Sequence, residues 1–177
     1  QHSVTTGEAV SFTPYVLRHP PPPVHCHPPS AIRQPSTANH QPPTDFMRAI
    51  STPNAPTPAG HYSQAMVHDG CVYVAGQLPI VPGQKEHHVG SIEEQTEQVF
   101  ANISAILRAA GSDLSHLLQV TVYVSDMELW GRFNAAYARL MGTHRPARAV
   151  VPVNALHYGY HIEVQAIAAV DQPGDGA

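Results

Sequence analysis

The chain has little cysteine, almost no lysine and no long apolar run. Its 177 residues include 2 Cys and one Lys, and the formal net charge is −4. Without about 18 consecutive apolar residues, it offers no candidate membrane-spanning helix. Two cysteines cannot build a disulfide framework, so a reduced, cytoplasmic setting is expected. The acidic balance gives no electrostatic basis for binding nucleic acid, and Lys85, in a polar loop, is poorly placed for Schiff-base chemistry.

Proline is abundant but unevenly placed, with ten of the 18 prolines in residues 1–46. Proline fixes φ and removes a backbone donor, and large apolar residues are few here, so we expect a disordered Pro/His-rich extension. Met47 precedes the first segment typical of a folded domain. Residues 1–46 are therefore an extension, a processed leader or a translation of upstream sequence. We expect one domain over 47–171 and a short flexible tail over 172–177.

The histidine-rich patterns do not predict a metal site. His25-Cys26-His27 lies in the proline-rich segment, whereas transition-metal sites need about four converging ligands held by structure. His157 and His161 flank a predicted turn and offer only two ligands. We therefore expect no metal at either pattern.

Residues 47–170 alternate between strand and helix patterns. Ser91 and Glu94 form a capping box that starts a helix, and Gly111 is a typical helix stop. Asp69-Gly70 predicts a tight hairpin turn, and Cys71, which opens the next strand, is expected to be a buried small residue. Strands are expected over 62–67, 71–75, 117–125, 148–153 and 161–170, and helices over 92–110 and 126–141.

These elements predict an α+β fold with two helices on one face of one mixed sheet. The strands are too apolar to leave the other face of the sheet bare. Burial of that face between subunits is the simplest remedy, so a homo-oligomer is expected.

Arg148 is the strongest candidate for a binding residue. It lies at the start of a strand among apolar residues, where an unpaired guanidinium would be costly. Its planar donor fork suits a ligand carboxylate, but an ion pair with a distant acid such as Glu163 explains it equally well. Arg145, three residues earlier, is expected to be a solvated charge.

Seven short segments follow one another along the predicted domain: Tyr62–Ala65, Val74–Pro79, Ile92–Thr96, Thr121–Asp126, Phe133–Tyr137, Arg145–Arg148 and Ile162–Ala168. In this order and spacing they resemble the RidA/YjgF reactive-intermediate deaminase family. No segment is decisive alone, but together they are strongly specific, and they span nearly the whole predicted domain.

The resemblance implies a chorismate-mutase-like fold and a homotrimer with its sites in the subunit clefts. Similar proteins act as 2-iminobutanoate/2-iminopropanoate deaminases. They hydrolyse short-lived enamines and imines, such as 2-aminoacrylate, to 2-oxo acids and ammonia. The family needs no cofactor or metal, and its partner molecules are small 2-imino and 2-oxo acids rather than nucleic acid or membrane.

Five residues match positions that line the family's site. Arg148 matches the arginine that grips the substrate carboxylate. The backbone of Val150 matches groups that face the imine nitrogen. Tyr62, Gly76 and Asn134 match residues that line the cleft, some of them contributed by the neighbouring subunit.

Two positions depart from the family pattern. Gln165 replaces the second acid of the Glu-x-Glu-Ala-Ile-Ala strand, an acid thought to position or activate the hydrolytic water. Glutamine can orient a water but cannot accept its proton. Ala75 replaces a common serine. The alternatives are therefore a trimer that binds or senses a small carboxylate, or a tailoring protein that acts on another unstable intermediate. Ribonuclease activity, sometimes ascribed to the family, is disfavoured by the acidic balance.

Overall fold

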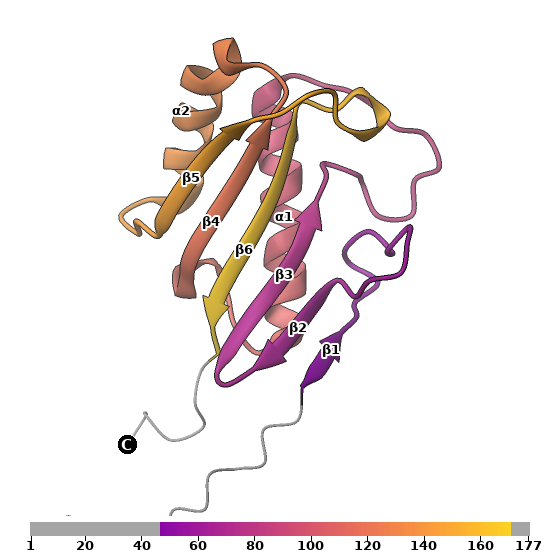
Figure 1. Cartoon of the computed structure of the whole chain (residues 1–177), viewed down its shortest axis with the longest axis vertical. Coiled ribbons are helices and arrows are strands. Elements are labelled where there is room, and N and C mark those ends of the chain that lie inside the picture. The colour runs from indigo at the N-terminus through magenta and orange to yellow at the C-terminus, as the bar shows by residue number, and fades with distance from the viewer. Residues whose placement is uncertain (1–46, 171–177) are drawn as a thin grey trace, which may run out of the picture. The chain divides into compact units, whose positions relative to one another are not determined.

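The computed structural model describes residues 47–170 (Figure 1). The expectations for residues 1–46 and for the tail lie outside this range. Two helices longer than one turn and six strands are found in the described range. The helices are α1 (Ile92–Ala110) and α2 (Trp130–Met141), and the strands are β1 (Arg48–Ile50), β2 (Ala65–His68), β3 (Cys71–Gln77), β4 (Leu117–Val124), β5 (Ala147–Pro152) and β6 (Ile162–Ala169).

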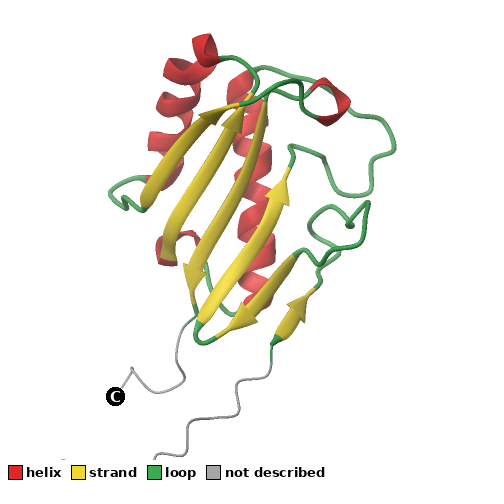
Figure 2. Cartoon of the chain, in the orientation of Figure 1, coloured by secondary structure: helices red, strands yellow, loops and turns green. Residues whose placement is uncertain are grey.

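The strands form one mixed sheet in the order β1-β2-β3-β6-β4-β5. β4 and β5 run parallel, and the other neighbours run antiparallel. Both helices lie behind the same face of the sheet, and the opposite face of the described part carries no helix (Figure 2). The predicted α+β layer is therefore confirmed. Neither of these helices is long and apolar enough to cross a membrane.

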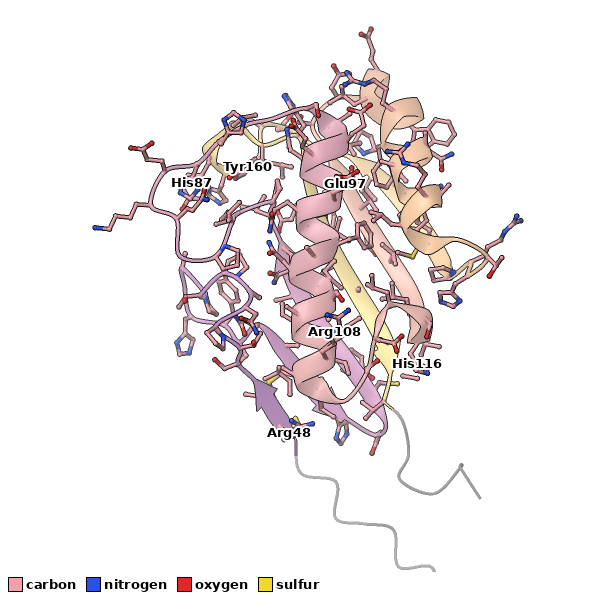
Figure 3. All side chains as sticks on the ribbon, turned by 180° about the vertical axis from the view of Figure 1, so that it is seen from behind. Arg48, His87, Glu97, Arg108, His116 and Tyr160 are labelled. Carbon is pink, nitrogen blue, oxygen red and sulfur yellow. The ribbon has the colours of Figure 1, made fainter. Side chains whose placement is uncertain are left out.

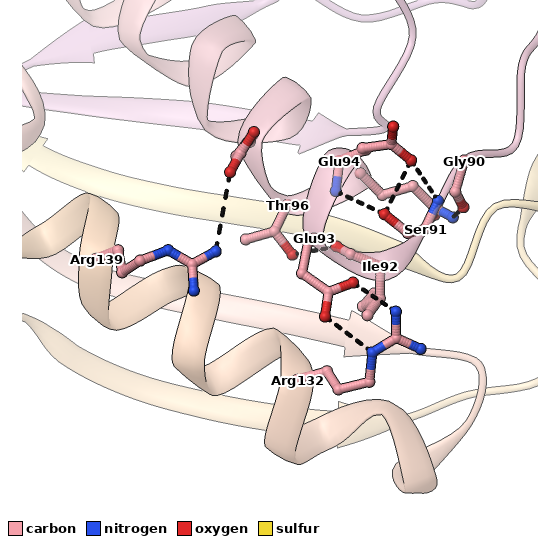
Figure 4. Close-up of polar contacts among 10 residues, drawn as sticks. Gly90, Ser91, Ile92, Glu93, Glu94, Thr96, Arg132 and Arg139 are labelled. Atoms are coloured by element: carbon pink, nitrogen blue, oxygen red, sulfur yellow. Dashed lines mark hydrogen bonds and ion pairs between the residues drawn. The ribbon is translucent and has the colours of Figure 1, made fainter.

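Helix α1 begins at the predicted capping box. Glu94 Oε2 accepts the Ser91 amide at 2.7 Å, and Ser91 Oγ accepts the Glu94 amide at 3.3 Å (Figure 4). These bonds satisfy amides that the first turn of a helix leaves free. Gly111 ends the helix in the left-handed region with φ 84°, as expected of a helix stop. Between these caps, the apolar side chains of α1 pack against the sheet.

The β2–β3 hairpin also has the predicted turn. Asp69 and Gly70 both have positive φ, 47° and 69°, and His68 pairs with Cys71 across the turn. Two consecutive positive φ values are typical of the two-residue turns that match the twist of a hairpin. Cys71 is only partly buried, so its predicted burial is wrong, because it pairs at the very end of the hairpin.

Several element boundaries differ from the prediction. The sequence does not predict β1, a three-residue edge strand. β2 begins at Ala65 rather than at Tyr62, because residues 60–62 form a tight turn in which the Tyr62 amide donates to the Gly60 carbonyl at 3.0 Å. β3 continues beyond Ala75 to Gln77, with a shift in its register to β6 after Val74.

The second helix starts later than expected. Asp126 does cap a helical segment, but that segment is a 3₁₀ turn over Met127–Leu129, in which the Glu128 amide donates to Asp126 Oδ1 at 2.8 Å. The α-helix proper begins at Trp130. A short polar side chain that bonds to nearby backbone amides can favour a turn over a regular helix. Here the Asp126 side chain stabilises a separate 3₁₀ turn before α2.

The open face of the sheet mixes polar and apolar side chains. Strand alternation places Glu163 and Gln165 on this face, while the intervening Val164 is buried under the helices. By register, Tyr73 and Val151 share the open face and are 46% and 37% exposed. These exposed apolar side chains agree with the expectation of an oligomer, which stays a prediction.

Candidate functional site

Four of the six residues predicted to form the site divide between two cavities. Tyr62 and Gly76 line the first cavity, of about 580 Å³. Asn134 and Arg148 line the second cavity, of about 500 Å³. Two strands, β6 and β4, separate β3 from the edge strand β5 that bears Arg148. One chain therefore brings the predicted residues together in pairs but does not unite the pairs.

Glu163 supplies the carboxylate of the first cavity. Among the described residues that line this cavity, it is the only acid. Its carboxylate lies directly against Gly76, where an added Cβ would overlap with Glu163 Oε1. The φ of Gly76 is not positive, so the backbone conformation does not demand glycine here. A Cβ at this position would instead displace the end of the Glu163 side chain.

Gln64 fixes the loop that forms one wall of the first cavity. Its side chain is buried, and its Oε1 accepts the Thr52 amide at 2.7 Å. Its Nε2 donates to the carbonyls of Thr52, Ala55 and Pro56 at 3.0, 3.3 and 2.9 Å. One buried amide thus satisfies four backbone groups of a segment that has no regular structure of its own.

Helix α1 fixes two further loops around the same cavity. Asn102 Nδ2 donates to the carbonyls of Leu78 and Ile80 at 3.1 and 2.9 Å. Gln95 Oε1 accepts the His161 amide at 2.8 Å. Both amide side chains are buried, so the loops of the cavity are tied to the most regular element of the fold.

Arg148 is held by polar and aromatic contacts in the second cavity. Its Nη2 donates to Asn134 Oδ1 at 2.8 Å. Its guanidinium carbon lies 4.5 Å from the ring centroid of Tyr137 and 5.6 Å from that of Phe133, within the range of cation–π attraction. No carboxylate of residues 47–170 forms an ion pair with it, and Glu163, the alternative partner, lines the other cavity.

Tyr137 lies beneath the arginine and was not singled out by the sequence. Its ring packs against Phe100 and Phe133, with centroids 5.5 and 5.7 Å apart. Its hydroxyl is buried and has no hydrogen-bond partner in the described part of the chain. Burial raises the pKa of this phenol, and the nearby Arg148 cation acts in the opposite direction. The side chain therefore stays neutral and serves as a ring platform.

Val150 and Arg145 lie near the second cavity. The Val150 side chain packs against the core, and its backbone pairs with Val122 in β4. β5 is the edge of the sheet, so part of its backbone remains available to another molecule. Arg145 is exposed at the cavity and forms no ion pair with an acid of the described range.

Gln165 lies outside both cavities. Its Oε1 accepts the Tyr123 hydroxyl at 2.9 Å, and it lines a small hollow of about 170 Å³ on the open face, together with Gln119 and Thr121. Gln165 and Glu163 share a face of β6, so strand alternation alone could not distinguish them. In the sequence, only Gly76, which leaves room for the Glu163 carboxylate, could have indicated that Glu163 rather than Gln165 lines the cavity.

The histidines do not assemble a metal centre in the described region. His161 Nδ1 bonds Ser125 Oγ at 2.9 Å, and His157 lies at the rim of the first cavity. No group of three His, Cys, Asp or Glu residues within 47–170 could hold an ion. The pattern at 25–27 lies outside that range.

The ion pairs of the helices lie apart from both cavities. Arg132 Nη2 and Glu93 Oε2 are 2.6 Å apart, and Arg139 and Glu97 are 3.9 Å apart (Figure 4). The Arg132 contact lowers the pKa of Glu93. These exposed pairs connect α1 with α2 and contribute little to stability.

Comparisons with known proteins agree with this arrangement. A RutC family protein of Pyrococcus horikoshii is 45% identical over 119 residues, which cover 67% of this chain and 94% of that protein. The crystal structure of yeast Mmf1 matches with a TM-score of 0.68 at 40% identity, over 71% of this chain and 100% of that one. E. coli TdcF, whose structure contains bound serine, matches with a TM-score of 0.66 at 28% identity, over 70% of this chain and 99% of that one.

The family model described as endoribonuclease L-PSP matches residues 52–170. This range includes both cavities and every strand except β1. The chain therefore belongs to the RidA/YjgF family, as its seven sequence segments indicate.

Proposed function

We propose that the protein is a deaminase that hydrolyses 2-imino acids and their enamine forms to 2-oxo acids and ammonia. The supporting observation is the complementary chemistry of the two cavities. Arg148 offers a guanidinium with no acid partner in the described residues, and Glu163 offers a carboxylate. A 2-imino acid has a carboxylate beside the carbon that water attacks. A site that hydrolyses it therefore needs a cation for the carboxylate and, close by, a proton acceptor for the water.

The two groups would meet between subunits. Arg148 belongs to the edge strand β5, while Glu163 lines a cavity near β3. In a homotrimer, each β5 edge can face the first cavity of the next copy, which gives three equivalent sites. This assembly would also cover the exposed Tyr73 and Val151 on the open face.

The proposed reaction is an ordinary hydrolysis. Arg148 binds the substrate carboxylate, and backbone groups near Val150 face the imine nitrogen. Water attacks C2 of the protonated imine while Glu163 accepts a proton from the water. Glu163 then gives this proton to the nitrogen. As the C–N bond breaks, the carboxylate takes up the remaining hydroxyl proton while the C=O bond forms, and ammonia and the 2-oxo acid leave. An enamine first becomes the imine by protonation at carbon. No atom is oxidised or reduced overall, so the scheme needs no oxidant or reductant.

The geometry favours Glu163 over Gln165 as the group that moves the proton. Gln165 already accepts a hydrogen bond from Tyr123 and lies outside both cavities. An amide cannot take a proton from water, whereas a carboxylate can. On this assignment, the glutamine does not weaken the deaminase.

A coupled assay tests the proposal. A serine or threonine dehydratase generates the enamine, and release of the 2-oxo acid is followed for the wild type and three variants. Arg148→Ala and Glu163→Gln should each reduce the enzyme-dependent rate at least about a hundredfold, and Gln165→Glu should leave it within about twofold. A wild-type rate equal to that of Arg148→Ala contradicts the proposed function. A large change in Gln165→Glu with none in Glu163→Gln would return the proton-transfer role to position 165.

A second candidate is a non-catalytic trimer that senses a small carboxylate or tailors another intermediate. The bound serine in the similar protein TdcF favours it. Calorimetry with serine and 2-oxobutanoate would support sensing if binding saturates, depends on Arg148 and occurs without turnover. The description of the matching family model makes ribonuclease a third candidate, and a lack of RNA cleavage at low salt would exclude it.

The proposed location is the cytoplasm. The relative Mmf1 is named as a mitochondrial protein, so the two compartments are real alternatives for this chain. Cell fractionation that recovers the protein with mitochondria would contradict the cytoplasmic proposal.

A further inference from the structure

Tyr158 occupies a strained backbone position at the rim of the first cavity. Its φ and ψ are 60° and 15°, and Gly159 follows with φ 76°. Bulky side chains rarely adopt this left-handed region. Strained residues persist only where their surroundings hold them, and they concentrate at functional sites. The strain therefore points to a function for the Tyr158 side chain.

His87 holds the Tyr158 ring from a second loop. The two rings are stacked, with centroids 3.8 Å apart and planes at 22°. His87 also makes an edge contact with Tyr160, at 6.2 Å between centroids, and these two residues lie together beside the upper end of α1 (Figure 3). Tyr160 is buried, whereas Tyr158 is 51% exposed. The buried Tyr160 thus anchors His87, and His87 in turn holds the Tyr158 ring, whose other face stays exposed.

Apolar and aromatic side chains make up much of the lining of the first cavity. Tyr62, Leu78 and Ile80 line the same cavity, and Tyr62 is 53% exposed. Glu163 is the only carboxylate among its described lining residues, and no lysine or arginine of that range lines it. A substrate side chain that enters here meets rings and aliphatic groups rather than a cation. The cavity volume of about 580 Å³ also exceeds the needs of a three-carbon imino acid.

We propose that Tyr158 is a specificity-determining residue and that the preferred substrates are 2-imino acids with an aromatic or other large apolar side chain. This inference rests on the proposed deaminase function. The substrate side chain would pack on the Tyr158 ring, since aromatic groups attract one another beyond the effect of buried area. The chemistry is unchanged: water adds at C2, the C–N bond breaks, and the products are the 2-oxo acid and ammonia.

Two variants of Tyr158 distinguish the effect of its aromatic ring on substrate preference from the effect of its strained backbone. Tyr158→Phe keeps the ring. Tyr158→Asn removes it, and asparagine tolerates the left-handed backbone, so the variant should fold at least as well as the wild type. Thermal unfolding checks this. Because the variants leave Arg148 and Glu163 intact, the chemistry itself should survive in both.

The assay compares a large and a small substrate. An amino acid oxidase makes the imine of phenylalanine or of alanine, and semicarbazide traps the imine that the protein has not hydrolysed. The wild type and Tyr158→Phe should have the higher kcat/KM for the phenylalanine imine. Tyr158→Asn should lose about tenfold or more on that imine and less than about twofold on the alanine imine. His87→Ala, which removes the stacking partner, should shift selectivity in the same direction by a smaller factor.

The outcomes distinguish this inference from the proposed function. Suppose that the wild type hydrolyses both imines, and that Tyr158→Asn loses activity equally on both or on neither. That result overturns the role of Tyr158 and leaves the proposed deaminase function intact. A loss in Tyr158→Phe as large as in Tyr158→Asn also overturns it, because the ring would then not matter. Failure of the wild type to hydrolyse either imine overturns both proposals.

Discussion

The guanidinium of Arg148 lies over the ring of Tyr137, 4.5 Å from its centroid. Tyr137 is in turn packed against Phe100 and Phe133, and Asn134 accepts a hydrogen bond from the same guanidinium at 2.8 Å. The arginine is thus held in one orientation by a ring and an amide, without an acid partner in the described residues. A cation held in this way is preorganised for an incoming carboxylate.

Two replacements of Tyr137 should distinguish the contribution of its ring from that of its hydroxyl. Tyr137→Leu removes the cation–π contact, so the KM for a 2-imino acid should rise about tenfold while kcat changes less. Tyr137→Phe keeps the ring and removes a buried hydroxyl that has no partner in the described residues, so KM should stay near the wild-type value and stability should not fall. Steady-state kinetics and thermal unfolding measure both. Equal KM values in all three proteins would contradict the positioning role.

Gly76→Ala should damage catalysis without unfolding the protein. The added Cβ would occupy the space of the Glu163 carboxylate and displace it, which should lower kcat about a hundredfold. The backbone at Gly76 does not have a positive φ, so alanine adds no conformational strain. The measurements are kcat and the unfolding midpoint. Wild-type activity in Gly76→Ala would show that the position of Glu163 is not critical.

Gln64→Ala should loosen the wall of the first cavity. It leaves up to four buried or partly buried backbone groups without their partner, and a loss of about 2–3 kcal/mol in the free energy of unfolding is expected. The exposed Gln84 offers a matched control, since Gln84→Ala should change stability by less than about 0.5 kcal/mol. Denaturant unfolding tests the pair, and similar values for both variants would contradict this role of Gln64.

The capping box of α1 should make the stability of the fold depend on pH. Hydrogen bonds from Ser91 lower the pKa of Glu94 below its ordinary 4.5. A lowered carboxyl pKa stabilises the fold above the unfolded pKa, and this stabilisation is lost as the pH falls through the folded value. Ser91→Ala should cost about 1 kcal/mol at neutral pH, and the difference from wild type should shrink below pH 4.5.

Ser104 provides the control for this helix. It lies within α1 and has no side-chain hydrogen bond in the described residues, so Ser104→Ala should be neutral or slightly stabilising. Unfolding curves at several pH values compare the two variants. Because the amide of residue 91 still donates to Glu94 in this variant, a Ser91→Ala penalty that is independent of pH would contradict the contribution of the bond between the Ser91 hydroxyl and the Glu94 carboxylate.

The fold was predictable where the signals are local. Ser91, Glu94 and Gly111 define α1 because caps act within a single turn, and Asp69-Gly70 defines its hairpin for the same reason. Strand β1 was missed because three residues at a sheet edge contain no periodicity. Asp126 caps a 3₁₀ turn instead of α2, since one cap signal does not specify which kind of helix follows.

The sequence named candidate residues for the site but could not give their arrangement. Arg148, Tyr62, Gly76 and Asn134 were named as candidates, and only the three-dimensional structure shows that they line two separate cavities. Glu163 was considered only as an ion-pair partner, because its approach to Gly76 depends on the register between β3 and β6. Long-range register of this kind is not encoded in any one segment.

In the proposed trimer, Arg148 of one subunit and Glu163 of another form one site. Mixing two inactive variants tests this shared site directly. Arg148→Ala and Glu163→Gln chains are unfolded together, refolded at a 1:1 ratio and assayed with the dehydratase-generated enamine. The control replaces the Glu163→Gln chain by the double variant Arg148→Ala/Glu163→Gln, which cannot supply an intact arginine.

In a random cyclic trimer, a site receives an intact Arg148 from one chain and an intact Glu163 from its neighbour in roughly a quarter of cases. The mixture should therefore recover roughly a quarter of the wild-type activity, while the control mixture stays inactive. A mixture no more active than the two separate variants, although it has refolded and assembled, would contradict a site shared between subunits.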